Sequence, residues 1–178
     1  MLVDCDPQGS ALSWAESADE GGKELPFPVI GLAVRDVHRR VRAFERDYEH
    51  VVFDTPPGEL AIARSALKAA DAAVVAVPPT KIDLDRVLPT LELVADVEDE
   101  TGLTFQVLLT RVKRISREGR DTREAMGEMG LPVMETEIPF LALYSDAFGA
   151  AIEDLGEYAR VARELLGEPS KTGKGVPA

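Results

Sequence analysis

The chain has 178 residues, 45% of them hydrophobic, which is enough for one well-buried domain and short for two. Its formal net charge of -12 repels nucleic acid and anionic membranes, so a contact with DNA requires a local basic patch. The single cysteine, Cys5, excludes an internal disulfide and a multi-cysteine zinc site, and no apolar stretch is long enough to cross a bilayer. We therefore expect a cytoplasmic protein that does not enter a membrane.

Short apolar runs along the chain predict its strands. An initial strand ends at Asp4, and near-continuous apolar runs follow at 51–53, 73–77 and 105–109. Runs that are apolar on both faces are typical of a parallel sheet that is covered on both sides. A further short strand is expected near Val133.

Helical patterns separate these strands. The predicted helices cover 34–48, 84–94 and 151–166. Segment 16–28 contains charges, glycines and prolines and predicts a mobile connection. The order of elements predicts an α/β fold with a doubly wound, mostly parallel sheet and helices on both faces. We expect one domain over 1–166 and a flexible tail over 167–178.

Acidic side chains follow two of the predicted strands. Asp4 and Asp6 come after the first strand, and Asp54 ends the second. Ligands of open parallel sheets bind outside the carboxyl ends of the strands, where these carboxylates would repel one another unless a cation lay between them. Magnesium with phosphate oxygens is the expected occupant. For each Asp taken alone, a capping or turn role is the alternative.

The segment after the second strand strengthens this interpretation. The apolar run 51–53 followed by Asp54 is the Walker B pattern. The loop that comes next is Thr55, Pro56, Pro57 and Gly58. Its prolines stiffen a backbone that could sense a terminal phosphate.

These stretches resemble a known family. LVDCDPQGS at 2–10 and VVFDTPPG at 51–58 resemble the ParA/MinD group of P-loop ATPases, specifically the ParA-type DNA partition proteins. The later stretches VPPTKIDLD, LLTRV and EIP fit the same pattern, so the similarity extends from residue 1 to about residue 166. The resemblance implies ATP and magnesium as ligands.

The resemblance implies a role for each residue at the first two strand ends. Asp54 would hold magnesium through water, and Asp4 would support the metal shell. Asp6 would lie near the attacking water and act in hydrolysis. The loop Thr55, Pro56, Pro57 and Gly58 would be the switch that follows the γ-phosphate.

A base-binding site is implied after the fourth strand. Arg111 would lie against the adenine, with Ile138 and Pro139 lining the base pocket, and Thr110 would be a further nucleotide-binding residue. A guanidinium plane that stacks on a base is physically reasonable independently of the family. A surface ion pair is the alternative for Arg111.

The family's glycine-rich, lysine-bearing loop has no counterpart in this chain. That loop cradles phosphate with its backbone N–H groups, so a strand, loop and helix unit of roughly 30 residues is expected ahead of Leu2. Without this unit, we do not expect tight ATP binding, and the loss of a central strand would expose apolar faces and favour oligomers. A truncated ATPase and a natural degenerate relative are the two explanations.

The function that the resemblance implies is DNA segregation. ATP would close a homodimer that binds DNA without sequence preference and associates with the nucleoid, and a centromere-binding partition protein of the ParB or ParG type would stimulate hydrolysis and release. The candidate DNA patch is Lys113, Arg114, Arg117, Arg120 and Arg123. A salt-bridged exposed helix explains these residues equally well, because acidic residues dilute the patch.

The alternative function is a non-catalytic protein that binds a segregation partner. The arginine-rich helix predicted over 34–48 would supply the surface. Septum-positioning members of the group carry a C-terminal amphipathic membrane helix, whereas the last residues here are rich in glycine and proline, which disfavours that type.

Overall fold

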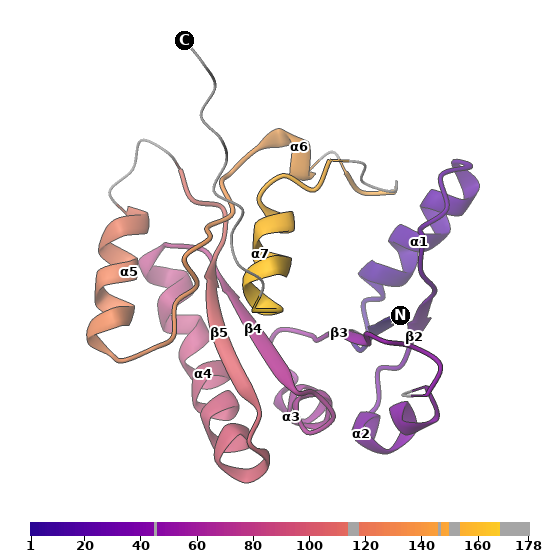
Figure 1. Cartoon of the computed structure of the whole chain (residues 1–178), viewed down its shortest axis with the longest axis horizontal. Helices are drawn as coiled ribbons and strands as arrows, with labels where there is room; N and C mark the ends of the chain where they lie inside the picture. Colours follow the sequence, from indigo (N-terminus) through magenta and orange to yellow (C-terminus); the bar gives the residue numbers. More distant parts are fainter. Residues whose placement is uncertain (45, 114–117, 146, 150–153, 168–178) are drawn as a thin grey trace.

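Two parallel sheets organise the chain (Figure 1). The computed structural model describes residues 1–44, 46–113, 118–145, 147–149 and 154–167. The first sheet has the order β2-β1-β3 and consists of β1 (Leu2–Asp4), β2 (Val29–Gly31) and β3 (Val52–Asp54). The second sheet pairs β4 (Ala72–Val77) with β5 (Thr104–Leu109). The predicted α/β fold with parallel strands is confirmed.

The helices connect and cover these strands. Their bounds are α1 Ser10–Glu20, α2 Val37–Arg40, the 3-10 helix η1 Val41–Ala43, α3 Leu60–Leu67, α4 Lys81–Thr101, α5 Glu118–Glu128, α6 Ala142–Ser145 and α7 Tyr158–Leu165. None of the described helices is long and apolar enough to span a membrane. Helix α4 begins at a cap in which the Thr80 hydroxyl accepts from the Asp83 amide, and it ends at Gly102 with a φ of 79°.

The predicted helix over 34–48 is much shorter in the structure. Only α2 and η1 form, because Val37 and Val41 are buried whereas Phe44 and Tyr48 are half-buried. Most helical stability in proteins comes from burying an apolar face, and this segment buries only its first turns.

Three other predictions need correction. Segment 16–28 is not wholly a connection, because α1 continues to Glu20 with Ala18 buried against the protein. The last helix begins at Tyr158, after Gly156 with a φ of 49°; residues 151–153 and the tail 168–178 lie outside the described residues. Near Val133 there is a single parallel bridge to Val107 instead of a strand. Strand β2 was not predicted because three residues are too few to show a pattern.

Helices lie on both faces of the sheets. On one face, Val3 of β1 packs in a cluster with residues of α2 and α3, and Val75 of β4 packs with residues of α3 and α4. On the other face, Asp4 of β1 contacts the start of α1, and Leu108 of β5 shares a cluster with Val161 of α7. This arrangement matches the predicted two-sided covering.

The two sheets are separate within the described part of the chain. Strand β3 pairs only with β1, and β4 pairs only with β5, although α3 connects β3 to β4 directly. Val52 of β3 is 57% exposed and Val74 of β4 is 37% exposed. Figure 1 shows the two groups of strands apart, with α3 between them. The expected exposure of apolar strand faces is therefore present at these two strands.

Candidate functional site

Three carboxylates meet at the carboxyl ends of β1 and β3. Asp4 and Asp54 are register partners on these neighbouring strands, and Asp6 begins the loop that leads to α1. The predicted juxtaposition of the three side chains is therefore present, because parallel strands bring their carboxyl ends to one edge.

Asp4 holds this loop in place. Its side chain is buried, with 1% of the residue exposed. One carboxylate oxygen accepts from the Asp6 amide and the other from the Leu12 amide, both at 3.0 Å. Asp6 in turn accepts from the Gln8 amide at 2.8 Å. Asp4 therefore joins the end of β1 to the first turn of α1, a role that sequence reasoning missed because Leu12 is eight residues away.

The three charges are electrostatically coupled. Asp54 as a whole residue is exposed, but its carboxyl group is partly buried. This burial is the main cause that raises the pKa of the carboxyl, and the negative charges of Asp4 and Asp6 raise it further. Burial and the charges of Asp4 and Asp54 raise the pKa of the Cys5 thiol to about 11. A cation at this edge would relieve the repulsion.

The carboxylates at this edge suit a magnesium ion that is held through water rather than bound directly. Among the described residues, no group of three or more His, Cys, Asp or Glu side chains forms a metal site. Both oxygens of Asp4 already accept backbone N–H groups, so Asp54 is the better placed carboxylate. Magnesium usually takes one or two carboxylates, with water and phosphate oxygens completing its shell. Asp54 acting through water fits this pattern.

Asp54→Asn is expected to stabilise the fold at neutral pH. Because the folded-state pKa of Asp54 is raised, its ionised form destabilises the native state above that pKa, and this cost disappears as the pH falls through it. Solvent screening limits the gain in free energy of unfolding to less than about 1 kcal/mol. Urea unfolding at pH 7 and pH 4 measures it.

Asp85→Asn on α4 is the matched control, because Asp85 is exposed and lies outside the carboxylate cluster of Asp4, Asp6 and Asp54. We expect no gain from it at either pH. A gain for Asp54→Asn that is equal at pH 7 and pH 4 would contradict the charge explanation.

The predicted switch loop follows β3 directly. Pro56 is buried, whereas Thr55, Pro57 and Gly58 are exposed. Gly58 has a φ of 85°, which side-chain-bearing residues rarely adopt. The loop is therefore fixed at its start by the buried Pro56 and is accessible to a ligand at Gly58.

The predicted base-binding residues gather in one pocket. Thr110, Arg111, Ile138 and Pro139 line a cavity of about 150 Å³ after β5. A backbone bridge between Val112 and Pro139 brings the two segments together. Thr110 and Arg111 lie far from Ile138 and Pro139 in the sequence, and the structure brings them together, while their role toward adenine stays a prediction.

Aromatic side chains that sequence reasoning missed complete this pocket. Phe140, Tyr144 and Tyr158 line it, and the two tyrosine rings meet edge to face with their centroids 5.0 Å apart. The Tyr144 hydroxyl donates to Glu157 at 2.6 Å. Residues 140–144 follow Pro139 directly, and this proximity was the available signal.

Arg111 has an unusual backbone conformation. Its φ is 56°, a positive value that is uncommon outside glycine and often marks a functional position. Its guanidinium lies 5.4 Å from the centroid of the Phe140 ring, and it forms no ion pair with another described residue. The alternative of a surface ion pair is therefore not seen in the described part of the chain.

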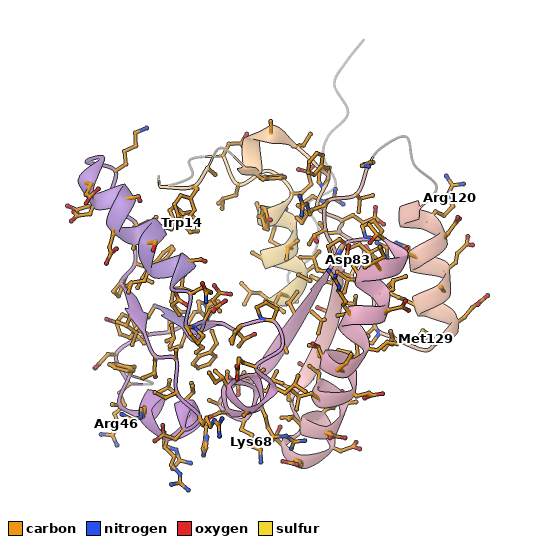
Figure 2. The ribbon with its side chains drawn as sticks, turned by 180° about the vertical axis from the view of Figure 1, so that it is seen from behind. Trp14, Arg46, Lys68, Asp83, Arg120 and Met129 are labelled. Atoms are coloured by element: carbon orange, nitrogen blue, oxygen red, sulfur yellow. The ribbon has the colours of Figure 1, made fainter. Side chains whose placement is uncertain are left out.

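The predicted DNA patch is only partly available. Lys113 and Arg120 are exposed, and Figure 2 shows Arg120 pointing away from the rest of the protein. Arg123 instead donates to Glu137 and to the Met134 carbonyl, both at 2.7 Å. Arg114 and Arg117 lie outside the described residues. Arg123 thus joins α5 to the segment that leads to the base pocket, which fits the salt-bridge alternative at that position.

The chain is similar to known proteins in sequence and in fold. No protein-family model matches the chain. The chain is 32% identical over 184 residues to "Maintenance of carboxysome distribution protein A" of Gloeobacter kilaueensis, a match that covers 93% of this chain and 79% of the relative.

Two solved structures with bound nucleotide share the fold. The complex of a Cyanothece McdA variant with ATP has a TM-score of 0.70 at 17% identity, covering 97% of this chain and 86% of that chain. Cobyrinic acid a,c-diamide synthase from Mycobacterium smegmatis, with an ATP analogue and magnesium, has a TM-score of 0.66 at 20% identity, covering 92% and 78%.

Proposed function

This chain belongs to the ParA/MinD group of P-loop ATPases, and we propose that it acts in an ATPase that positions a cargo in the cell. Within that ATPase, the chain supplies the pocket for the base and the carboxylates near the metal. The observation that carries the proposal is the pocket in which Thr110, Arg111, Ile138 and Pro139 meet. The sequence and the family resemblance predict all four as nucleotide-binding residues, which supports the proposal. Bound nucleotide in two of the structural neighbours supports this: one is a complex with ATP, and the other holds an ATP analogue and magnesium.

In this proposal, each residue of the site has a separate role. Arg111 would lie against the base, and Asp54 would hold magnesium through water, where the metal neutralises phosphate charge. Asp6 would orient the attacking water, while Asp4 keeps the loop of Asp6 in position through its two backbone hydrogen bonds. The exposed loop after β3 would respond to the terminal phosphate.

The nature of the cargo is the finer part of the proposal. The relative from Gloeobacter kilaueensis is named for the maintenance of carboxysome distribution, which supports cargo positioning as the shared activity. DNA partition, with a plasmid or chromosome as cargo, is the second candidate, and the exposed Lys113 and Arg120 favour it. In both cases we expect an ATP-dependent homodimer, nonspecific DNA binding at the nucleoid and a partner protein that stimulates hydrolysis.

Binding of a fluorescent ATP analogue tests the base pocket. We expect weak, magnesium-dependent binding to the chain, which Arg111→Ala weakens by about tenfold, because the variant loses the guanidinium plane over the base. The control is Arg120→Ala, which removes an exposed arginine outside the pocket and should leave the affinity unchanged. Binding that neither variant alters, or that both alter equally, would overturn the proposed use of this pocket.

A further inference from the structure

Helix α7 has little apolar anchoring of its own. None of its residues is buried, and Tyr158 and Leu165 are 42% and 40% exposed. Most helices in proteins are stabilised by packing an apolar stripe against a neighbour, and α7 does so only in part. The polar contacts at its two ends therefore contribute much of what holds this helix in place.

At its C-terminal end, α7 holds the segment that leads to the base pocket. One Glu164 carboxylate oxygen accepts from the Glu135 amide, and the other accepts from the Thr136 amide at 3.0 Å. Burial raises the pKa of the Glu164 carboxyl, but the hydrogen bonds from Thr136 and Glu135 lower it more, so the net shift is downward. Glu164 therefore accepts as a carboxylate, and such hydrogen bonds are among the stronger ones in proteins.

Helix α5 holds neighbouring residues of the same segment. Arg123 of α5 donates to the Glu137 carboxylate and to the Met134 carbonyl. The Ile138 amide then donates to the Leu109 carbonyl at the end of β5, at 2.9 Å. The backbone just ahead of the pocket is thus fixed from two helices, and α7 supplies the contacts to its two middle residues.

The middle of α7 lies behind one wall of the pocket. Val161 packs against the buried cluster of Leu108, Met134 and Ile138. Ile138 also lines the base pocket, together with Pro139. Val161 therefore supports this wall by apolar contact, while Glu164 supports the backbone that leads to it.

At its N-terminal end, α7 is joined to α6 through Tyr144 (Figure 1). The Tyr144 hydroxyl donates to the Glu157 carboxylate at 2.6 Å and accepts from the Glu157 amide at 3.2 Å. Glu157 is the residue before the first turn of α7, and Tyr158 follows it. The rings of Tyr144 and Tyr158 meet edge to face, and both line the pocket. Tyr144 thus fixes the start of the helix with Tyr158 at the pocket.

This contact requires a glycine at position 156. A Cβ atom there would lie 2.7 Å from the Tyr144 hydroxyl oxygen, which is too close for two atoms that are not bonded. Gly156 also has a φ of 49°, which side-chain-bearing residues rarely adopt. The absence of a side chain lets the Tyr144 hydroxyl reach the backbone at the start of α7.

We propose that α7 positions the base pocket, with Glu164 and Val161 fixing the wall of Ile138 and Pro139 and with Tyr144 fixing Tyr158. This inference rests on the proposed function, because it concerns the site that would hold the base. Glu164 and Tyr144 are positioning residues, since each acts through a wall of the pocket. The carboxylates of Asp4 and Asp54 lie in the other sheet, so the metal and phosphate side of the site does not depend on α7.

Competition binding tests the dependence on the base. A fluorescent ATP analogue labelled on its ribose is displaced by ATP or by inorganic tripolyphosphate, in the presence of magnesium. We expect Glu164→Ala and Tyr144→Phe each to weaken displacement by ATP about five- to tenfold, the effect of one lost hydrogen bond, and to leave tripolyphosphate unaffected. A ratio of the two competitor affinities that either variant leaves unchanged would overturn the proposal.

Hydrogen exchange without nucleotide tests the anchoring itself. In Glu164→Ala, the Glu135 and Thr136 amides lose their acceptor and should exchange at least about tenfold faster than the global loss of stability explains. Glu164→Gln retains a carbonyl acceptor and should restore part of the protection. Exchange at these two amides that is unchanged in Glu164→Ala would overturn the proposal.

Two matched variants control for the loss of a carboxylate or a hydroxyl elsewhere. Glu124→Ala removes an exposed carboxylate from α5, and Tyr48→Phe removes a hydroxyl outside the pocket. Neither should change the competitor ratio or the exchange of the Glu135 and Thr136 amides. If either control changed the ratio as much as its partner variant does, the effect would not belong to α7 and the proposal would fail.

Failure of this inference is distinguishable from failure of the proposed function. Binding that depends on Arg111, with unchanged exchange at Glu135 and Thr136, would uphold the proposed function and overturn the positioning by α7. Faster exchange at these amides, with a nucleotide affinity that Arg111→Ala does not alter, would contradict the proposed function and the role of α7 in base binding, while its anchoring of the segment would stand.

Discussion

Asp4→Ala is expected to lower the free energy of unfolding by about 2–4 kcal/mol. The substitution leaves the amides of Asp6 and Leu12 without the carboxylate that accepts from both, at a position where the side chain is 1% exposed. Hydrogen bonds to a buried charged acceptor are among the stronger ones in proteins. Urea unfolding monitored by circular dichroism measures the loss.

The comparison with Asp6→Ala isolates the role of Asp4. Asp6 accepts from the Gln8 amide in an exposed turn, so its removal should cost less than about 1 kcal/mol. Asp4→Asn retains a carbonyl acceptor and should fall between the two alanine variants. If Asp4→Ala and Asp6→Ala destabilised the protein equally, the loop would not depend on the two hydrogen bonds of Asp4.

Asp4→Ala is also expected to make the loop that carries Asp6 more mobile. Asp4 joins the end of β1 to the first turn of α1, and Asp6 lies between these points. Hydrogen exchange at the Asp6 and Leu12 amides should therefore accelerate by more than the global loss of stability explains. The carboxylate predicted for the metal shell therefore also holds the loop of Asp6 in place through two backbone hydrogen bonds.

Leu109→Ala should be the most costly substitution in the core, at about 2–5 kcal/mol. Leu109 is fully buried at the end of β5, in the cluster that joins this strand to α4 and α5. Truncation removes apolar contact and leaves a cavity in a closely packed region. Leu88→Ala is the matched control, because Leu88 is exposed on α4 and should cost less than about 1 kcal/mol.

Leu109→Ala should also weaken the base pocket. The Leu109 carbonyl accepts from the Ile138 amide at 2.9 Å, and Thr110 and Arg111 follow it directly. Movement of Leu109 would therefore be transmitted to both walls of the pocket. Binding of the ATP analogue below the unfolding midpoint checks this, and an affinity equal to that of Leu88→Ala would contradict the coupling.

Much of the candidate site was predictable because it depends on local patterns. A strand that ends in an acidic residue identifies Asp4 and Asp54, and parallel pairing then brings the two together. Arg111 was found in the same way, as the residue beyond the end of β5. Each of these positions is defined by the apolar run before it.

The contacts that the sequence alone does not identify depend on distant partners. The sequence leaves a DNA patch and a salt bridge open for Arg123, and only the structure shows its partner Glu137, which is 14 residues away. Tyr158 joins the base pocket through Tyr144, from a helix that begins after a left-handed Gly156. No pattern within one element identifies such contacts.

By itself, the sequence determined the parallel α/β architecture and the acidic strand ends, because near-continuous apolar runs and the residues that close them are local properties of the chain. Only the tertiary structure decided that Asp4 fixes the loop of Asp6, that aromatic rings line the same cavity as Arg111, and that the described strands divide into two sheets. The physical reason is that hydrogen bonding and burial between distant segments depend on how the elements pack, which no single segment encodes.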